Sequence, residues 1–338
     1  MLILGIESSC DDTASAIVKD GRTVLSSVVA SQDAIHSAYG GVVPELASRR
    51  HIEMIIPVVE ESLKRAAVSL SDIDAIGVTQ GPGLVGSILV GLSFAKAVGY
   101  AKKKPFVGVN HISSHALSAF LEDGEKKEVP DFPFVALIVS GGHTALLSVD
   151  DYTEFKILGQ TRDDSAGEAF DKVAKLLGLG YPGGVEIDKL AKQGDPSVIE
   201  FKRPIIAKGS LEFSFSGLKT AVLQKVKGAE LNEDTKRNIA AGFQEAIVDV
   251  LVEKAMWAIE ATGVKNMVVA GGVACNSRLR QRISEVAVKN NIRLFIPPPR
   301  FCSDNGAMVA LSAYHIIKKK GAGAFGNLNL NADPSLEF

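Results

Sequence analysis

The feature of this chain that most constrains its fold is an internal repeat. Residues 3–31 read as an apolar strand, a small polar turn, a second strand, an Asp-Gly turn and a third strand, and residues 134–161 follow the same order. A constant offset of 131 residues aligns polar residues of the two copies, Ser9 with Ser140 and Thr13 with Thr144. Two copies of one unit at this separation predict duplicated lobes that face each other across a cleft. The alternative is two unrelated hairpins, because glycine and serine are common in any turn.

The rest of the chain alternates strand-like and helix-like segments, which is typical of an α/β fold. Asn232 to Thr262 has apolar residues at helical spacing and is followed by Gly263, a favourable helix stop. Asn266 to Ala270 reads as a short buried strand. The polar, acid-rich stretch from Glu122 to Asp131 is the predicted linker between the lobes.

Composition excludes several classes of protein. The 338 residues are 46% apolar with a formal net charge of −2, so the chain can form a core and is not of the disordered class. No stretch approaches the roughly 18 uncharged apolar residues of a membrane span, and no basic leader precedes the first strand. The three cysteines form no C-x-x-C pair, which fits a reducing compartment. We therefore expect a cytoplasmic protein without a membrane anchor.

Glycine-rich turns are the first candidates for binding chemistry, because their backbone N–H groups can approach a phosphate closely. Ser140-Gly141-Gly142-His143-Thr144 is the best of them, and Glu7-Ser8-Ser9-Cys10-Asp11-Asp12-Thr13 would face it from the other lobe. Gly271-Gly272 lies between a predicted strand and a helix, where Asn276 could bond a ribose or a base. Plain hairpin turns, and Asn276 as a helix N-cap, are the structural alternatives.

Gly81-Pro82-Gly83-Leu84-Val85-Gly86 matches the dinucleotide pattern G-x-G-x-x-G after an apolar strand. About 20 residues further on, where an acid would hold the ribose, the chain has Lys102-Lys103-Lys104. We therefore assign these glycines to a tight turn and to close helix packing. The P-loop pattern G-x-x-x-x-G-K-[ST] does not occur in the sequence.

His111 and His115 stand four residues apart in a segment that can be helical, so both imidazoles would share one helix face and could bind one metal ion. Two ordinary core or surface histidines are the alternative. Asp304, in a turn that opens a helix, is our choice of third ligand, with a helix N-cap as its alternative role. Such a set would leave coordination positions open. Ile112 stands where an H-E-x-x-H metalloprotease has its glutamate, which argues against a protease.

Two further acids and a basic region complete the candidates. Asp171 and Asp188 each fall on the polar side of a short predicted helix, where a carboxylate could accept hydrogen bonds from ribose hydroxyls, and solvated helical acids are the alternative. The net charge argues against indiscriminate nucleic-acid binding. A local excess of positive charge still allows a partial RNA footprint, and it comprises Lys202, Arg203, Lys208, Lys219, Lys225 and Lys227, followed by Arg278, Arg280 and Arg282.

Taken together, these motifs resemble one family over nearly the whole chain: the universal tRNA threonylcarbamoyladenosine transferases, called TsaD in bacteria and formerly O-sialoglycoprotein endopeptidases. The resemblance runs from Leu4-Gly5-Ile6-Glu7-Ser8-Ser9-Cys10-Asp11-Asp12-Thr13 to Ser303-Asp304-Asn305-Gly306. The motifs between these ends are Gly81-Pro82-Gly83-Leu84, His111 with His115, Ser140-Gly141-Gly142-His143-Thr144, the Asp171 segment, Phe213-Ser214-Phe215-Ser216-Gly217-Leu218-Lys219-Thr220 and Gly271-Gly272-Val273-Ala274-Cys275-Asn276. The opening motif is similar to the bacterial branch.

This resemblance implies an α/β fold of the actin-like, sugar-kinase and heat-shock ATPase (ASKHA) class, with two duplicated ribonuclease-H-like lobes around a nucleotide cleft. We expect residues 1–128 and about 308–328 in an N-terminal lobe that carries the metal helix. Residues 129–307 would form a C-terminal lobe with the nucleotide turns.

The resemblance also implies a site and a reaction. His111, His115 and Asp304 would bind one divalent metal ion, iron or zinc. An adenylate or ATP-type nucleotide would contact Val139, Ser140, Gly141, Gly142, His143, Asp171, Gly184, Asp188 and Asn276. The enzyme would transfer a threonylcarbamoyl group from threonylcarbamoyl-AMP to the exocyclic amine of the adenosine on the 3′ side of the anticodon, in tRNAs reading codons that begin with A.

By the same resemblance the partners are tRNA, the shorter paralogue TsaB as the other half of a heterodimer, and the ATPase TsaE. Our hypothesis for catalysis is that the metal holds phosphate and threonyl oxygens, the glycine turn donates N–H groups to the adenylate, and Asp11 helps to remove the amine proton. Two other functions would use the same nucleotide-binding turns. They are an ATP-dependent small-molecule kinase of the same fold and a non-catalytic nucleotide-binding scaffold.

Overall fold

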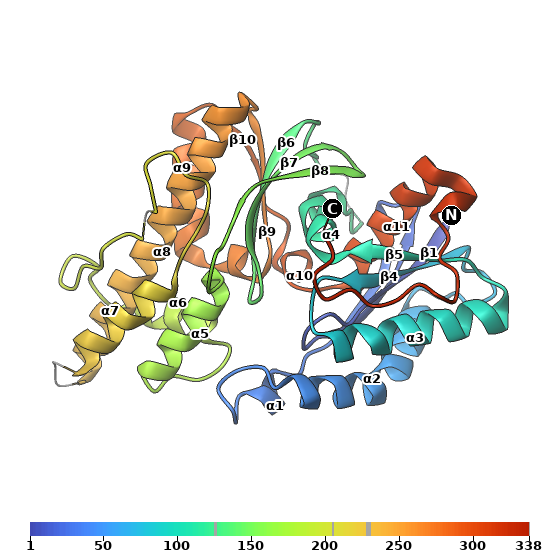
Figure 1. The fold of residues 1–338 in the computed structure, drawn as a ribbon, viewed down its shortest axis with the longest axis horizontal. Coiled ribbons are helices and arrows are strands. Elements are labelled where there is room, and N and C mark those ends of the chain that lie inside the picture. The colour runs from blue at the N-terminus through green and yellow to red at the C-terminus, as the bar shows by residue number, and fades with distance from the viewer. Residues whose placement is uncertain (125–126, 205, 228–230, 338) are drawn as a thin grey trace.

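Two lobes, each built on a five-stranded sheet, make up the protein (Figure 1). The structure, a computed structural model, describes residues 1–124, 127–204, 206–227 and 231–337. Of the predicted linker from Glu122 to Asp131, residues 125 and 126 lie outside the described residues. The two sheets have matching strand orders, β3-β2-β1-β4-β5 and β8-β7-β6-β9-β10.

The N-terminal sheet carries its helices α2 and α3 on one face. Its strands are β1 (Leu2–Glu7), β2 (Thr13–Lys19), β3 (Thr23–Ala30), β4 (Ala75–Gly81) and β5 (Phe106–Asn110). The helices are the short α1 (Asp33–His36), α2 (Pro44–Arg65) and α3 (Val85–Lys102). Apolar side chains such as Ile55 of α2 and Leu92 of α3 pack against Leu4 and Ile17 of the sheet, and they form the core of this face.

The C-terminal sheet is covered by a thicker layer of helices. Its strands are β6 (Phe134–Val139), β7 (Thr144–Asp151), β8 (Glu154–Gln160), β9 (Asn266–Ala270) and β10 (Arg293–Phe295). The helices are α5 (Ala166–Leu176), α6 (Gly183–Ala191), α7 (Ser216–Lys227), α8 (Glu233–Thr262), η2 (Gly272–Cys275) and α9 (Ser277–Lys289). The long helix α8 begins after its N-cap Asn232 and ends at Gly263, whose φ of 69° is left-handed, so the helix predicted there is confirmed.

The predicted repeat is confirmed strand by strand. The offset of 131 residues holds for the first residues of the second and third strands, Thr13 with Thr144 and Thr23 with Glu154. It also holds for the pairing register of the first two strands, with Glu7 opposite Ala14 and Ile138 opposite Ala145. In both lobes the first strand runs parallel to the fourth. Two unrelated hairpins would not share a register, so that alternative is wrong.

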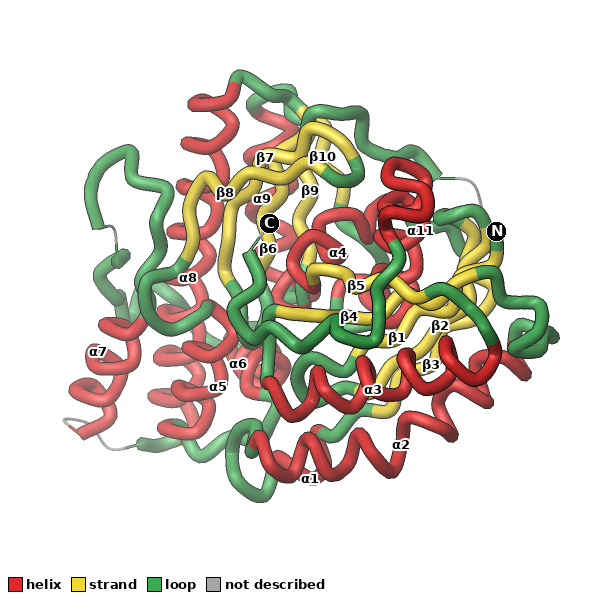
Figure 2. Tube along the Cα trace, turned by 45° about the vertical axis from the view of Figure 1, so that its right-hand side comes forward, coloured by secondary structure: helices red, strands yellow, loops and turns green. Residues whose placement is uncertain are grey.

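The last helix of each lobe crosses to the other lobe. α4 (His111–Leu117) follows β5, leads into η1 (Ser118–Phe120), and contacts β6 and β9. α11 (Gly306–Lys320) follows β10 and the short α10 (Pro299–Cys302), and it packs on β1, β2 and β4. The approach is so close that a Cβ on Gly5 would lie 1.9 Å from the carbonyl oxygen of Gly306. Figure 2 shows α4 between the two sheets, and α4 and α11 touch each other there.

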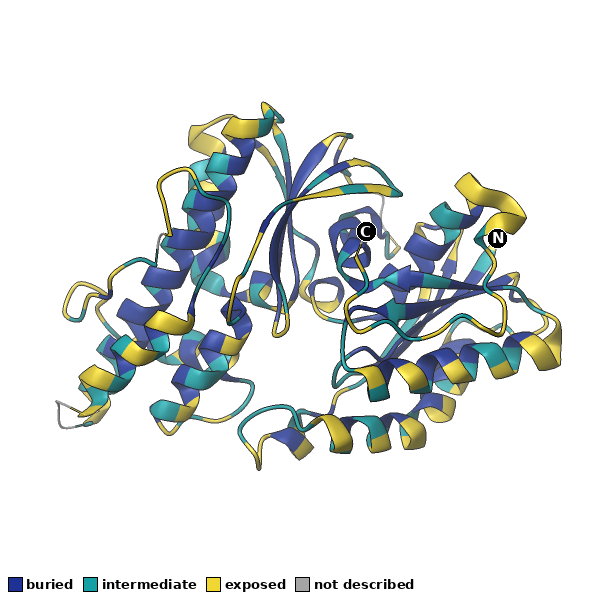
Figure 3. Cartoon of the chain, in the orientation of Figure 1, coloured by how far each residue is buried: buried dark blue, intermediate teal, exposed yellow. Residues whose placement is uncertain are grey.

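The outer surface and the chain end complete the fold. The helices bury the faces turned toward the sheets and expose the opposite faces (Figure 3). After η3 (Gly321–Ala324) the chain returns to the N-terminal sheet, where the Asp333 N–H donates to the carbonyl oxygen of Gln80 at 2.9 Å. Within the described parts of the chain, no helix has the length and apolar character needed to cross a membrane.

Candidate active site

The three predicted metal ligands come together where the two crossing helices meet, with His111 and His115 on α4 and Asp304 just before α11. His111 is the first residue of α4, and the side chain of Asn110 caps this helix by accepting hydrogen bonds from the N–H groups of Ile112 and Ser113. Asp304 lies just before α11, but the cap of α11 is Asn305, which accepts from the Met308 N–H at 2.9 Å. The alternative role of Asp304 as the helix cap is therefore wrong, and its carboxylate is available for another function.

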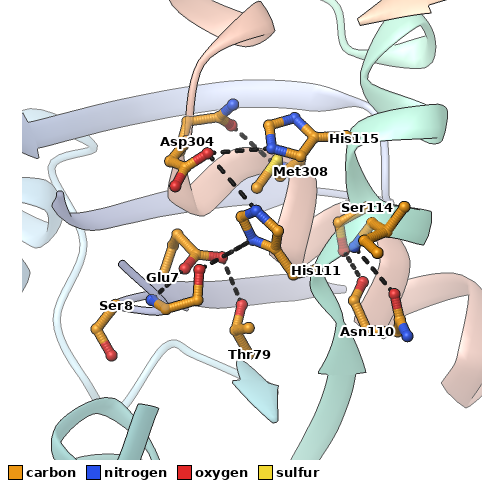
Figure 4. Close-up of polar contacts among 12 residues, drawn as sticks. Glu7, Ser8, Thr79, Asn110, His111, Ser114, His115, Asp304 and Met308 are labelled. Atoms are coloured by element: carbon orange, nitrogen blue, oxygen red, sulfur yellow. Dashed lines mark hydrogen bonds and ion pairs between the residues drawn. The ribbon is translucent and has the colours of Figure 1, made fainter. Parts of the chain in front are cut away.

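The ligand atoms of His111, His115 and Asp304 all lie within 4.8 Å of one another (Figure 4). Oδ1 of Asp304 is 3.0 Å from Nε2 of His115 and 3.7 Å from Nε2 of His111. The two imidazole rings meet edge to face with centroids 4.7 Å apart. Two imidazole nitrogens and one carboxylate oxygen on three sides of one point are a donor set that suits zinc or iron(II), with positions left for other ligands.

Glu7 orients the His111 ring from behind, and sequence reasoning did not identify it as a site residue. Its fully buried carboxylate lies 3.0 Å from Nδ1 of His111 and accepts a 2.6 Å hydrogen bond from Oγ1 of Thr79. A carboxylate at Nδ1 keeps the proton on that nitrogen and turns Nε2 toward the metal position. The available signal was an acidic residue at the end of a strand whose other inward positions are apolar.

The electrostatics of this cluster favour a bound cation. Burial opposes a charge on His111, but the carboxylates of Glu7 and Asp304 outweigh it and raise the His111 pKa to about 9. Burial likewise opposes the charge on Asp304, yet His111 and His115 hold the pKa of its carboxyl well below the usual range. Each shift reflects the attraction between positive charge and the carboxylates of Glu7 and Asp304, and a divalent ion would supply that positive charge in place of protons.

The turn after β1 places Asp11, the proposed catalytic base, next to the C-terminal lobe. The Tyr181 hydroxyl of the C-terminal lobe donates to Oδ2 of Asp11 at 3.3 Å, so this hydrogen bond spans the two lobes. Burial raises the pKa of Asp11 above its ordinary value. Burial, together with Asp304 and Asp11, raises the pKa of the neighbouring Asp12 to about 8. Carboxylates with raised pKa values are suited to accepting protons near neutral pH.

The predicted nucleotide turns lie side by side at the ends of the parallel strands β6 and β9. Gly271 has a φ of 94°, and a Cβ there would lie 2.3 Å from the carbonyl oxygen of Val139, so only glycine fits between the turns. Gly141, Gly142 and Gly272 differ, because a Cβ on any of them would meet no atom within 4 Å. These three glycines leave backbone accessible at the site.

Helices α5 and α6 place the remaining predicted residues around these turns. Oδ1 of Asp171 accepts from the N–H of Gly183, and burial raises the pKa of this carboxyl to about 6. Oδ1 of Asp188 accepts from the Ser277 hydroxyl at 2.8 Å. Gly184 has open space at its Cα, with Phe170 the only neighbour a Cβ would meet within 4 Å among the described atoms.

Both polar atoms of the Asn276 side chain already form hydrogen bonds within the protein. Its Oδ1 accepts from the Leu279 N–H at 3.0 Å, which confirms the predicted N-cap role, and its Nδ2 donates to Oε1 of Gln244 at 2.7 Å. The side chain is only 8% exposed. A nucleotide contact through this amide would therefore have to share or replace one of these partners.

His143 links the glycine turn to the metal cluster. Its ring centroid is 5.8 Å from that of His111, so the two lobes contribute adjacent imidazoles. Burial and the nearby His111 and His115 lower the pKa of His143 to about 4, which keeps this ring neutral. The predicted metal and nucleotide residues thus adjoin at one place between the sheets.

The predicted basic footprint is only partly available for RNA. The guanidinium groups of Arg203, Arg278 and Arg282 form ion pairs with acids of helices α8 and α9. Arg280 donates to the carbonyl oxygens of Ala274 and Pro297. The arginines therefore hold helices and loops together, and the lysines around α7 carry what remains of the predicted positive surface.

Comparison with known proteins identifies the family. The model of the TsaD family, described as tRNA N6-adenosine threonylcarbamoyltransferase, matches residues 23–311. The chain is 58% identical to the protein of that name from Geobacter metallireducens, over 92% of this chain and 90% of the relative. It is 54% identical to the protein of the same name from Syntrophus aciditrophicus, over 98% of this chain and 96% of the relative.

Solved structures share the fold at low sequence identity. A ROK hexokinase from Thermus thermophilus superposes with a TM-score of 0.53 at 14% identity, over 94% of this chain and all of the hexokinase. The activator of 2-hydroxyisocaproyl-CoA dehydratase from Clostridium difficile superposes with a TM-score of 0.54 at 16% identity, over 94% of this chain and 96% of the activator. The fold is therefore of the predicted ASKHA class. With the family match over most of its length, the chain belongs to the tRNA N6-adenosine threonylcarbamoyltransferases.

Proposed function

We propose that this tRNA-modifying transferase carries out its reaction where the metal cluster meets the glycine turns, with threonylcarbamoyl-adenylate as donor. Family membership establishes the transfer to N6 of adenosine in tRNA, and so sets aside the kinase and scaffold alternatives. The observation that carries the proposed site is the cluster of His111, His115 and Asp304, whose ligand atoms lie within 4.8 Å of one another. It adjoins His143 of the nucleotide turn.

The chemistry needs alignment and charge stabilisation more than a strong nucleophile. The N6 amine is weak because its lone pair is delocalised into the purine, but the donor is an activated mixed anhydride. The amine nitrogen forms a bond to the carbamoyl carbon, the bond from that carbon to the phosphate oxygen breaks, and AMP leaves. Holding both substrates in reacting geometry can supply much of the rate enhancement.

The residues of the N-terminal lobe and of the α11 start would provide charge and proton transfer. Asp11 accepts the proton that the amine loses, which its burial and raised pKa favour. His111, His115 and Asp304 would hold a divalent metal ion, and Glu7 would keep His111 in the required tautomer. When bound, such an ion supplies positive charge close to anionic oxygens of the donor.

The C-terminal lobe would hold the adenylate. Gly141 and Gly142 are exposed and have no neighbour where a side chain would be, so their N–H groups can approach a phosphate. Asp171 and Asp188 lie on α5 and α6, and each can accept from a ribose hydroxyl besides its present partners, which for Asp188 are Ser277 and Lys192, because a carboxylate has about four acceptor sites. Gly184 leaves room beside them.

The TsaB paralogue, as the resemblance implies, would dock on the exposed faces of α2 and α3, and the ATPase TsaE would join this assembly. The two helices pack against each other, and they expose large apolar side chains at Ile52, Ile56, Val85 and Leu89. Exposed apolar residues gathered on neighbouring helices are typical of a protein interface. Transfer of label by the chain with and without each partner would test these assignments.

The transfer assay tests the proposed site directly. Purified metal-loaded chain, the two partners, preformed threonylcarbamoyl-adenylate and unmodified tRNA are combined, and labelled threonine in tRNA is counted. We expect label with the parent chain and with Glu260→Ala, a control at an exposed acid of α8, and none above background with Asp304→Ala. Equal labelling of tRNA by Asp304→Ala and by the parent would show that the transfer reaction does not depend on the metal cluster.

A further inference from the structure

Two of the three cysteines lie beside the candidate site on two segments that contact each other but are distant in the sequence. Cys275 ends η2, and Cys302 ends α10. Arg280 connects the two segments, because its Nε donates to the carbonyl oxygen of Ala274 at 2.7 Å and its Nη2 lies 3.5 Å from Sγ of Cys302. Sγ of Cys275 lies 4.0 Å from the carbonyl oxygen of Pro299, the first residue of α10, and Sγ of Cys302 lies 3.2 Å from that of Pro297, so both thiols lie against the same short segment.

The two thiols differ in the way that an attacking and a resolving cysteine differ. Cys275 is exposed, whereas Cys302 is completely buried and donates to the carbonyl oxygen of Pro297 at 3.2 Å. The neighbouring Cys302 thiol and the positive charge of Arg280 lower the pKa of Cys275 to about 6. An accessible thiol that ionises readily, next to a second thiol, is the arrangement found in peroxide-sensitive cysteines.

We propose that Cys275 and Cys302 form a reversible disulfide on exposure to peroxide, and that the oxidised protein loses its transferase activity. The Cys275 thiolate attacks one peroxide oxygen, the O–O bond breaks, and hydroxide leaves and is protonated to water. The sulfur of Cys302 then attacks the resulting sulfenic acid, its proton goes to the departing hydroxyl as water, and the S–S bond forms. Two electrons pass from the thiols to the peroxide, which becomes two waters.

The position of Cys302 explains why oxidation would reach the active site. Cys302 lies two residues before Asp304 in a turn that is held by Asn305, whose Nδ2 donates to the carbonyl oxygen of Ser303 at 2.8 Å. A disulfide fixes its two sulfur atoms about 2.05 Å apart, so its formation would draw Cys302 toward Cys275. The turn must follow its cysteine, and Asp304 would then leave its place beside His115. This second half of the inference rests on the proposed function, whereas the disulfide itself does not.

The test uses the metal-loaded chain with its partners, treated with hydrogen peroxide and then with dithiothreitol. Peptide mapping without reduction should find one cross-link between the Cys275 and Cys302 peptides, with the mass of two hydrogen atoms lost. Transfer activity of the parent should fall roughly tenfold or more on oxidation, as expected when the surroundings of a metal ligand are disturbed, and return on reduction. Cys275→Ser should keep its activity within about twofold under the same treatment.

The matched variant separates the disulfide from other oxidative damage. Oxidation of a bound iron, or of Cys10, would affect Cys275→Ser and the parent alike, so equal losses in both would overturn the proposal. A peptide map without the cross-link would overturn it too, as would a complete cross-link with activity retained. Asp304→Ala in untreated samples tests the proposed function separately. A failure there leaves the peptide map as an independent test of the disulfide.

Discussion

The ends of β1 and β6 occupy the same place in the two lobes, yet they have opposite characters. Glu7 lies opposite Ala14 in one sheet, and Ile138 lies opposite Ala145 in the other. Both Glu7 and Ile138 are completely buried. One lobe therefore has a buried carboxylate that faces a metal cluster where the other has an ordinary core residue. Duplication supplied a symmetrical frame, and the chemistry depends on the positions where the two copies differ.

The turns that follow these strands differ in the same way. In the N-terminal lobe the turn is packed by the chain itself, since a Cβ on Gly83 would lie 2.5 Å from the carbonyl oxygen of Ser9. In the C-terminal lobe Gly141 and Gly142 face open space. With the offset of 131 residues, Asp11 corresponds to Gly142. The first turn presents an acid, and the second leaves room for a ligand.

The largest effect is expected from removing the acid of the first turn. Asp11→Asn keeps the shape and the hydrogen bond from Tyr181 but cannot accept a proton, so turnover should fall by roughly 10²–10⁴-fold. Single-turnover transfer and equilibrium binding of an adenine nucleotide would be measured together. We expect nucleotide binding to persist, and unchanged turnover would show that Asp11 is not the base.

Removing the charge of Glu7, whose counterpart Ile138 in the other lobe is uncharged, should weaken metal binding by the cluster. Glu7→Gln removes the charge behind His111 with little change of volume, and zinc affinity should fall by about 10–100-fold. A competition titration with a chromogenic chelator measures this. Thr79→Val, which removes only the hydroxyl that donates to Glu7, is the matched control and should have a smaller effect. Equal zinc affinities of Glu7→Gln and the parent would contradict the role of Glu7.

The two turns should respond differently to one added methyl group. Gly141→Ala meets no atom, so the melting temperature should stay within about 2 °C while adenine-nucleotide affinity falls, by roughly tenfold, because backbone approach is obstructed. Gly83→Ala forces a Cβ against Ser9 and should lower the melting temperature instead. The comparison fails if Gly141→Ala melts early and binds nucleotide normally.

The smallest effect concerns Asp171, a partly buried acid of the C-terminal lobe. Burial raises its pKa to about 6 from an ordinary value of 3.8, so its ionisation opposes folding, with no effect below about pH 4 and the full effect above about pH 6. Asp171→Asn should therefore melt like the parent at pH 4. At pH 7.5 it should melt higher by roughly 2–4 °C. A difference that shrinks between these pH values would contradict the assignment.

The sequence predicts features that depend on local order and on one long repeat. The paired strands, the α8 helix and the spacing of His111 and His115 all follow from patterns of this kind. The convergence of Asp304 with His115 depends on two helices crossing between lobes, and no local pattern encodes that crossing. Glu7 was missed for the same reason, since its partner His111 lies 104 residues away. Asp304 and Asn305 could both have been the cap of α11, and only the backbone geometry distinguishes them.

The two crossing helices, as we propose, hold a metal ion at the junction of the lobes. Anomalous diffraction from crystals of the zinc-loaded chain, recorded on both sides of the zinc absorption edge, tests this proposal most directly. We predict one strong peak bounded by His111, His115 and Asp304, with Glu7 behind His111 and not bound to the ion. A zinc peak elsewhere, with Oδ1 of Asp304 still hydrogen-bonded to Nε2 of His115, would contradict this assignment.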